Sequence, residues 1–365
     1  MTSQTLTVSS PKGEYTIQIG AGLSSALGAT LRSLAPSGDC LPIVSDETVW
    51  SLHGETLRSS LGAAGFSPAV FLIPPGEESK SLSQLGALYN HFADIAADRD
   101  TPVVAFGGGV VGDLCGLAAA TYMRGIPYIQ MPTTLLAQAD ASVGGKTAVN
   151  LPRGKNLVGA FYFPKAVLAD TDLLKTLPRR EFQNGMAEII KCAAISDASL
   201  FARLTAEAVE EARQGGSLAE IIAMSCSIKS DIVASDPFDQ GRRMCLNFGH
   251  TFGHAWERAK LPTDRGALRH GEAVALGMVA AALLGEILGC TAGGTAARLR
   301  HCLENNGLDC SFRPLSPESI AWDKKRSAQS LSFVFLKEIG QAFVEKIPLA
   351  KLEAMFREVA ETWPK

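Results

Sequence analysis

The sequence lacks the short motifs that mark several common kinds of site. None of its eight cysteines forms a Cys-x-x-Cys pair, and neither a Gly-x-Ser-x-Gly elbow nor a Walker sequence occurs. These absences exclude a cysteine-based zinc cluster, a serine hydrolase elbow and a P-loop. The cysteines are scattered and mostly flanked by apolar residues, which is typical of buried, reduced thiols. Nucleophilic catalysis therefore has no candidate residue of its own.

An excess of charge of one sign is also missing. The 365 residues carry a formal net charge of −3 with both signs mixed along the chain, which argues against a nucleic-acid surface. The first residues lack the pattern of a signal peptide, and the apolar stretch 273–288 is interrupted by Gly277, Gly285 and Glu286. With 46% hydrophobic residues, a large globular core is expected. We therefore expect a soluble, cytoplasmic protein without a nucleic-acid or membrane partner.

Two regions of different pattern follow one another along the chain. Up to Pro178, strand-like runs alternate with helical ones, which predicts a mostly parallel sheet wrapped by helices. After it the pattern is almost wholly helical, so we predict an α/β Rossmann-like nucleotide-binding domain over 1–178 and a mainly helical domain over 179–365. The expected strands are 5–9, 15–19, 41–44, 69–73, 102–106, 127–131, 332–336 and 341–345. The expected helices are 22–34, 82–97, 179–195, 197–213, 217–235, 245–259, 270–289, 293–305, 317–327 and 349–363.

A glycine-rich turn separates an apolar run from an alanine-rich one. The run 101–106 enters the triple glycine 107–109, and a helical pattern leaves it. Glycines let the backbone approach a ligand, and the N–H groups at a helix start face an anion. An ordinary turn between a strand and a helix would have the same pattern. The cluster of short polar motifs that follows, up to Asn156, favours a phosphate-binding site.

Three of the six histidines lie close together in the second region. His250 and His254 are one helical turn apart on one face, and His270 begins the next expected helix. Two imidazoles and one carboxylate form a common catalytic zinc set. The carboxylate candidate is Glu188, whose apolar neighbours make its charge costly unless it is partnered. The pattern predicts a metal or proton-transfer site, although a salt bridge from Glu188 to Lys191 would also explain the carboxylate.

Basic residues recur beside these positions. Most lysines are solvated surface groups, but together these could form a pocket for a substrate that carries phosphate and carboxylate. They are Arg124, Lys146, Lys155, Lys191, Lys229, Arg243, Lys324 and Lys325.

The motifs resemble, in order and over nearly the whole chain, those of the 3-dehydroquinate synthase family of sugar-phosphate cyclases. They are GGGVVGD (107–113), AATYMRGIP (119–127), PTTLL (132–136), SVGGKT (142–147), GKN (154–156), NFGHTFGH (247–254), HGEAVA (270–275) and DKK (323–325). The resemblance implies a fold shared with glycerol dehydrogenase-like proteins, in which an α/β nucleotide-binding domain precedes an all-α metal-binding domain, with the active site between them. It also implies bound NAD, a divalent metal that is usually zinc, with cobalt as an alternative, and a homodimer.

The resemblance also implies roles for individual residues. The implied metal ligands are Glu188, His250 and His270. The implied NAD contacts are Asp46, Glu77, Lys80, Gly109, Val110, Val111, Gly112, Asp113, Thr133, Thr134, Asp140, Lys146, Lys155, Leu173, Leu174, Lys175 and Thr176. The implied catalytic and substrate-binding residues are Arg124, Lys146, Asn156, Lys191, Lys229, Arg243, Asn247, His254 and Lys324.

The activity that the resemblance implies is a redox-neutral cyclisation. The substrate, 3-deoxy-D-arabino-heptulosonate 7-phosphate, would become 3-dehydroquinate and phosphate, with NAD taking a hydride and returning it. His254 is the candidate proton shuttle, because an imidazole titrates near neutral pH. The chain departs from the family pattern at Pro75, Ala141 and Leu151, and none of these changes removes an implied metal ligand or pocket cation.

Three other functions fit parts of the pattern. A metal-dependent polyol dehydrogenase of the same fold would accumulate NADH and need no cationic pocket. Four basic residues argue against it, namely Lys146, Lys191, Lys229 and Arg243. A sister cyclase would act on another sugar phosphate, but Asn247, His254 and Lys229 match the dehydroquinate-forming pattern. A non-catalytic nucleotide-binding or scaffold protein would be expected to have lost a metal ligand, and none is lost.

Overall fold

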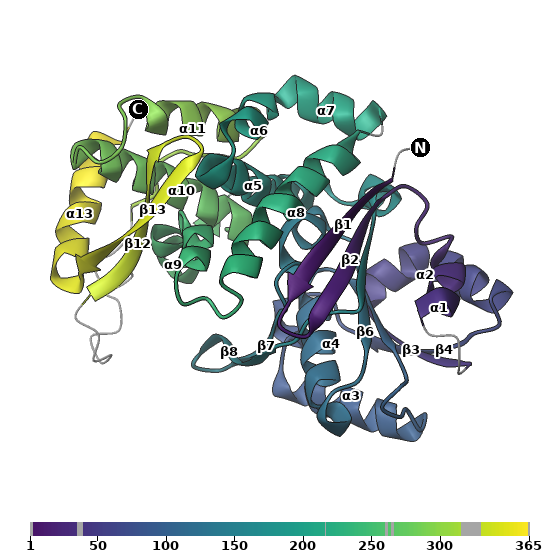
Figure 1. Ribbon diagram of the computed structural model, residues 1–365. Helices are drawn as coiled ribbons and strands as arrows, with labels where there is room; N and C mark the ends of the chain where they lie inside the picture. Colours follow the sequence, from purple (N-terminus) through teal and green to yellow (C-terminus); the bar gives the residue numbers. More distant parts are fainter. Residues whose placement is uncertain are drawn as a thin grey trace. The chain divides into compact units, whose positions relative to one another are not determined.

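The chain divides into two compact units in the computed structural model (Figure 1). The structure describes residues 3–34, 39–215, 217–259, 262–263, 266–314 and 330–363. The first unit contains Met1–Phe182 and Leu218–Pro237, and the second contains Gln183–Ser217 and Phe238–Lys365. Compact units grouped by contact are not the same as consecutive domains, so the domain boundary at residue 178 stays a prediction.

A seven-stranded sheet forms the centre of the first unit, in the order β1-β2-β9-β6-β5-β3-β4. All neighbouring pairs are parallel except β1 with β2, which form the expected N-terminal hairpin. The sheet therefore confirms the predicted α/β pattern, because parallel neighbours require crossover connections. Its strands are β1 (Gln4–Ser10), β2 (Gly13–Gly20), β3 (Cys40–Asp46), β4 (Ser67–Ile73), β5 (Val103–Gly107), β6 (Tyr128–Pro132) and β9 (Ala166–Asp170).

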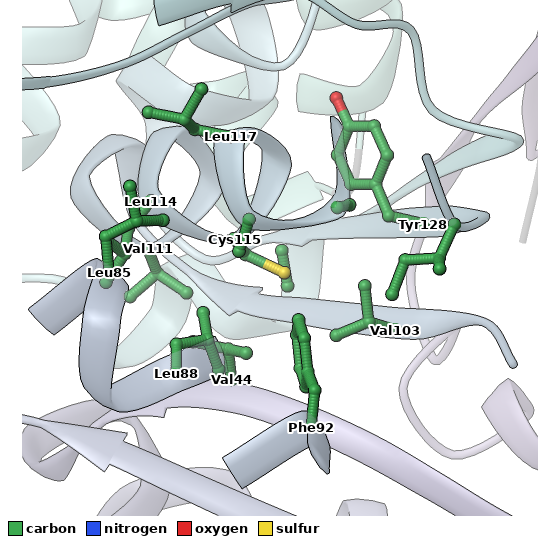
Figure 2. Close-up of a cluster of buried hydrophobic side chains, with 14 of the residues drawn as sticks. Val44, Leu85, Leu88, Phe92, Val103, Val111, Leu114, Cys115, Leu117 and Tyr128 are labelled. Carbon is green, nitrogen blue, oxygen red and sulfur yellow. The ribbon is translucent and has the colours of Figure 1, made fainter. Parts of the chain in front are cut away.

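Helices cover both faces of this sheet, and the alternation of side chains along β5 shows how. Val103 and Ala105 pack against α3 and α4, in the cluster that Figure 2 shows. Val104 and Phe106 point the other way, into a second cluster with α1 and α2. Successive side chains of a strand face opposite sides, so a fully apolar strand indicates burial on both. The helices are α1 (Leu27–Leu34), α2 (Glu47–Ala63), α3 (Leu82–Asp94), α4 (Gly109–Thr121) and α8 (Leu218–Ser235), the last packed on β1 and β2.

A second hairpin in the first unit was not predicted. Strands β7 (Lys146–Leu151) and β8 (Gly154–Phe161) pair with each other and lie outside the main sheet. Most residues of β8 are partly or fully exposed, so the sequence carries no alternating apolar signal there. Lys146 and Lys155 both lie on this hairpin. Short helical turns complete the unit at η1 (Glu77–Ser79), η2 (Tyr122–Arg124), η3 (Ala137–Ala141) and η4 (Thr171–Thr176).

The second unit is mainly helical, and α10 is its central helix. It packs against α9, α11, α13 and β12. By length and composition α10 could cross a membrane, yet 72% of that window is buried, so it is the core helix of this unit. The helices are α5 (Arg179–Ser196, which begins in the first unit), α6 (Ala198–Arg203), α7 (Ala206–Gly215), α9 (His250–Ala259), α10 (His270–Ile287), α11 (Thr295–Asn305) and α13 (Leu349–Thr362). The remaining elements are η5 (Arg242–Asn247) and the hairpins β10 (Pro262–Thr263) with β11 (Gly266–Ala267) and β12 (Ser330–Glu338) with β13 (Gln341–Pro348).

Two of the expected helices are broken. The segment 245–259 is a 3-10 turn followed by α9, because Gly249 has a φ of +79°, which an α-helix does not allow. A Cβ on Gly249 would also approach the backbone of Met278 to 2.8 Å, so only glycine fits at this crossing of α9 and α10. The segment 197–213 is interrupted between Arg203 and Ala206. The helix expected at 317–327 lies outside the described residues.

Candidate metal centre and nucleotide-binding site

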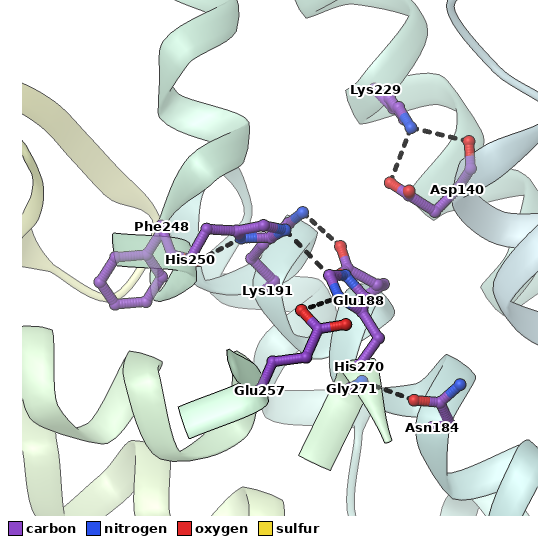
Figure 3. A network of polar contacts seen from close by, with 10 residues as sticks. All are labelled: Asp140, Asn184, Glu188, Lys191, Lys229, Phe248, His250, Glu257, His270 and Gly271. Atoms are coloured by element: carbon purple, nitrogen blue, oxygen red, sulfur yellow. Dashed lines mark hydrogen bonds and ion pairs between the residues drawn. The ribbon is translucent and has the colours of Figure 1, made fainter. Parts of the chain in front are cut away.

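Three helices of the second unit bring Glu188, His250 and His270 together (Figure 3). Glu188 lies on α5, while the two histidines are the first residues of α9 and α10. One ligand atom from each lies within 4.8 Å of the others. The Oε1 atom of Glu188 lies 3.5 Å from Nε2 of His270 and 3.8 Å from Nε2 of His250. These three residues, far apart in the sequence, therefore form one cluster.

The spacing of these atoms fits a shared cation better than hydrogen bonds. Atoms that ligate a tetrahedral zinc at about 2.1 Å lie about 3.4 Å from one another. The distances to Glu188 are at or beyond the limit of a hydrogen bond, and its buried Oε1 has no hydrogen-bond partner among the described residues. A carboxylate oxygen that is buried in this way is costly unless a charge compensates it. Zinc or another divalent ion would do so, and two imidazoles with one carboxylate leave a coordination position open.

The protonation of His250 supports the same interpretation. Burial, followed by the nearby Lys191 ammonium, holds the pKa of His250 well below its usual value, so the ring is neutral. Its Nδ1 lies 3.2 Å from the carbonyl oxygen of Phe248, which can only accept, so Nδ1 carries the proton. Nε2 then presents a lone pair towards the Glu188 carboxylate. Two electron-pair donors that face each other are consistent with a cation between them.

Lys191 compensates part of the buried charge. Its ammonium forms an ion pair with Oε2 of Glu188 one turn away on α5, and the side chains are 3% and 1% exposed. Burial alone would raise the pKa of Glu188, but Lys191 and then the two histidines outweigh it and hold that pKa well below its usual value. The salt bridge that the sequence offered as an alternative explanation is present, and it coexists with the histidine cluster.

Two contacts around His270 were not recognised from the sequence. Its Nδ1 lies 3.7 Å from Oε2 of Glu257, on α9 (Figure 3). Burial disfavours the charged ring, but Glu188 and Glu257 raise the pKa of His270 to about 9. The side-chain oxygen of Asn184, on α5, accepts a hydrogen bond of 2.5 Å from the N–H of Gly271, which follows the histidine. The spacing of Glu257 two helical turns after His250 could have revealed it as a residue of the same face.

The other residues expected near the metal lie at different depths of the second unit. His254 is exposed, and its ring centroid lies 5.3 Å from that of His250 and 6.4 Å from that of His270. Arg243 is buried, with 2% of its surface exposed, and Asn247 is exposed at the end of η5. Lys324 lies outside the described residues.

The glycine-rich turn has the predicted form in the first unit. Strand β5 ends at Gly107, Gly108 caps α4 without a side chain, and the helix begins at Gly109. The N–H groups of Val110 and Val111 therefore lie in the first turn, where an anion can accept hydrogen bonds from the backbone. A Cβ on Gly107 would come within 2.5 Å of the Val111 side chain, so glycine is required for this turn.

A network of polar side chains lies around this turn. Lys80, which is buried, forms an ion pair with Asp113 of α4 and donates a hydrogen bond of 2.5 Å to the side-chain oxygen of Asn156. Burial raises the pKa of Asp113, although the Lys80 ammonium opposes this. Asn150 donates to Glu77 at 2.7 Å and accepts from the backbone N–H of Asn156 at 2.9 Å. The structure thus joins three residues implied in NAD binding with one implied in substrate binding.

A second pair in the first unit joins α8 to η3. Nζ of Lys229 donates to the backbone oxygen of Asp140 at 2.7 Å and to its carboxylate at 2.8 Å. Lys229 is 7% exposed, so this amine is held mainly by Asp140 in a buried position. The sequence had assigned these two residues to different ligands, and the structure brings them into direct contact.

The remaining predicted residues of the first unit occupy strand ends and turns. Asp46 caps α2 by accepting from the N–H of Val49 at 2.9 Å. Thr133 and Thr134 follow β6, where the hydroxyl of Thr134 accepts from the N–H of Ala137 at 3.2 Å. In η4, Leu173 and Leu174 are buried, whereas Lys175 and Thr176 are exposed. Four further predicted residues are exposed, namely Arg124, Lys146, Lys155 and Asn156.

Comparison with known proteins gives two matching family models. The model of the 3-dehydroquinate synthase N-terminal region matches residues 70–184, and that of the C-terminal region matches residues 185–326. A 3-dehydroquinate synthase from Geobacter metallireducens is 44% identical over 342 residues, covering 92% of this chain and 94% of the relative.

Two solved structures of sugar-phosphate cyclases are also similar. One is a 2-deoxy-scyllo-inosose synthase complexed with carbaglucose-6-phosphate, NAD+ and Co2+, with a TM-score of 0.84, 26% identity and coverage of 98% of this chain and 99% of that one. The other is a 2-epi-5-epi-valiolone synthase from Streptomyces hygroscopicus subsp. jinggangensis 5008 with NAD+ and Zn2+ bound, with a TM-score of 0.83, 28% identity and coverage of 95% and 97%.

Proposed function

The chain belongs to the 3-dehydroquinate synthase family, and from that premise we propose that it converts 3-deoxy-D-arabino-heptulosonate 7-phosphate into 3-dehydroquinate and phosphate. The observation that carries this beyond the family match is the Glu188, His250 and His270 cluster, which has the composition and spacing of an open zinc site. In reaction class this is a carbon–oxygen lyase that acts on a phosphate. It belongs to the shikimate pathway of aromatic biosynthesis.

The two cofactors would supply chemistry that no side chain of the chain offers. Glu188, His250 and His270 would hold a divalent metal, which would supply Lewis-acid chemistry to a substrate oxygen, and NAD would supply a reversible hydride acceptor. Related cyclases have been crystallised with NAD+ and with Co2+ or Zn2+, which supports both cofactors here.

We propose that the residues of the first unit hold NAD. The open N–H groups at the start of α4 would bind its pyrophosphate, since a helix N-terminus favours an anion. Glu77, Lys80 and Asp113 lie around the same turn and would bind its sugars through their existing polar network. The other residues proposed here for NAD are Asp46, Thr133, Thr134, Asp140, Lys146, Lys155 and 173–176.

We propose that cationic and polar side chains hold the substrate. Arg124, Lys146 and Asn156 would bind its phosphate, while Lys229 and Arg243 would bind its carboxylate. Lys191 would donate to a substrate oxygen next to the metal because its amine already lies at Glu188. His254 would exchange a proton with the substrate, since it is exposed beside the histidine cluster. Asn247 and Lys324 complete the proposed set.

A phosphate-release assay that follows NADH in the same cuvette tests this function. With NAD, metal and the heptulosonate phosphate, phosphate should be released in stoichiometric amounts while the absorbance of NADH returns to its starting level. A steady rise of NADH would favour the polyol dehydrogenase, and release only from another sugar phosphate would favour a sister cyclase. The two matching family models and the 44% identity to a 3-dehydroquinate synthase support phosphate release without lasting NADH.

We also propose that the protein is a cytoplasmic homodimer. All eight cysteines are free thiols, which suits a reducing compartment. Sedimentation of the purified protein should give twice the 38.6 kDa of one chain, and a monomer at working concentration would contradict the dimer.

A further inference from the structure

We propose that Glu257 is a positioning residue for the metal, whose carboxylate attracts the Nδ1–H of His270 across an ion-pair distance of 3.7 Å so that Nε2 faces the ion. The proposal rests on the metal site of the proposed function. It adds a residue that contacts a metal ligand but not the metal itself. Metal-binding histidines generally donate their second N–H to a carboxylate, a carbonyl or water, which fixes the tautomer and the ring orientation.

The two nitrogens of His270 lie towards two different carboxylates. Nε2 lies 3.5 Å from Oε1 of Glu188, and Nδ1 lies 3.7 Å from Oε2 of Glu257 (Figure 3). His270 can bind a metal only in its neutral form, which carries one proton, so one nitrogen donates while the other offers a lone pair. The proton on Nδ1 towards Glu257 leaves the lone pair on Nε2, next to Glu188.

The helix geometry places Glu257 where this role requires it. Glu257 lies seven residues after His250 on α9, so both side chains leave the same face of the helix. That face packs along α10, the helix that begins with His270. The Glu257 side chain is 18% exposed, so its carboxylate is largely removed from water beside the imidazole. His250 is oriented in a similar way, because its Nδ1 donates to the carbonyl oxygen of Phe248.

A competing possibility is that Glu257 is itself a ligand. His254, Glu257 and His270 also place one ligand atom each within 4.8 Å of the others. That set would use Nδ1 of His270 and would leave Oε1 of Glu188 and Nε2 of His250 facing each other at 3.8 Å without an ion. The Glu188 side chain is 1% exposed and that of Glu257 is 18% exposed. A more deeply buried carboxylate is costlier without a compensating charge, which favours Glu188 as the ligand.

The test is the zinc affinity of variants in the absence of substrate and NAD, measured by competition with a coloured chelator. Glu257→Gln removes the charge that holds His270 and should weaken zinc binding by about 10- to 100-fold. Glu257→Asp keeps the charge on a shorter side chain and should lie between the wild type and Glu257→Gln. The Co2+ absorption spectrum of Glu257→Gln should also shift, because the ring would no longer be held in one orientation.

Glu272→Gln is the matched control. It removes one negative charge two residues from His270, yet the Glu272 carboxylate accepts from the backbone N–H of Arg269 at 2.7 Å and caps α10, which glutamine can also do. Its zinc affinity should stay within about threefold of the wild type.

Three results would overturn the proposal. Unchanged zinc affinity and an unchanged Co2+ spectrum in both Glu257 variants would show that Glu257 does not orient the His270 ring. An equal loss in Glu272→Gln would show a general charge effect, and a loss as large as that of Glu188→Gln would make Glu257 a ligand. A wild-type protein that binds no zinc would remove the metal of the proposed function as well, whereas the first three results would leave that metal in place.

Discussion

The proposed metal centre and the residues proposed to bind NAD are built in contrasting ways. In the second unit, Glu188, His250 and His270 project from three packed helices towards one point, with the carboxylate almost fully buried. In the first unit, charged side chains near the glycine-rich turn pair with one another, as Lys80 does with Asp113 of α4. Metal binding would therefore occupy a preformed gap between ligands, whereas NAD would bind to side chains that already pair with one another.

This contrast predicts that the two halves can be disabled separately. A ligand change should abolish metal binding and leave NAD binding intact, and a change in the polar network should do the reverse. Each of the following variants tests one side of the contrast.

The largest effect is expected for His270→Ala. Changing a residue that only contacts a metal ligand lowers zinc affinity by at most about 100-fold, so the loss of a ligand itself should lower it by more. Phosphate release should stop. NAD affinity, measured by calorimetry, should stay within about threefold because no residue of the nucleotide half is changed. A parallel loss of NAD binding would contradict the separation of the two halves.

The next effect concerns the stability of the metal half. Lys191→Met removes the cation that pairs with buried Glu188, which should lower the free energy of unfolding of the metal-free protein by about 3–5 kcal/mol. Urea unfolding measures this, and Lys191→Arg, which keeps the charge, should lose less. If Lys191→Met is as stable as the wild type, Glu188 is not held as a buried anion.

A smaller effect is expected in the nucleotide half for Lys80→Met. Its amine joins Asp113 and Asn156, so its removal should weaken NAD binding about tenfold, or about 1.4 kcal/mol. Zinc affinity should not change. A fall in zinc affinity, with NAD binding preserved, would show that Lys80 supports the metal site and not NAD binding.

The smallest effect is expected for Asn184→Leu. Its side-chain oxygen satisfies the N–H of Gly271 in the first turn of α10, so the loss of this hydrogen bond should lower the free energy of unfolding by about 1–2 kcal/mol. Thermal unfolding would show the change, and Asn184→Asp, which retains the acceptor, should be closer to the wild type. An unchanged unfolding temperature in Asn184→Leu would show that the contact adds no stability.

The metal cluster was easier to predict from the sequence than the polar contacts of the first unit. His250 and His254 stand one turn apart in a helical pattern, and apolar neighbours mark Glu188, so the metal cluster could be predicted from residue spacing and chemistry. The parallel sheet was predicted from the alternation of strand-like and helical runs, and the apolar run of β5 fits a strand that is buried on both faces.

The rest depended on tertiary contacts that local patterns do not encode. The hairpin of β7 and β8 has an irregular register and exposed side chains, so periodicity gives no signal. The pairing of Lys229 with Asp140 spans 89 positions, and nothing near either residue indicates the other. The break before α9 depends on the close approach of Gly249 to Met278, which only the packed structure reveals.

The most direct test of the central claim is the zinc content of wild-type protein and of Glu188→Gln after dialysis against a weak chelator. Glu188 belongs to only one of the two clusters that contain His270, and an amide is a much poorer zinc ligand than a carboxylate. The wild type should retain about one zinc per chain and Glu188→Gln very little. Equal retention by the two proteins would contradict the metal centre described here.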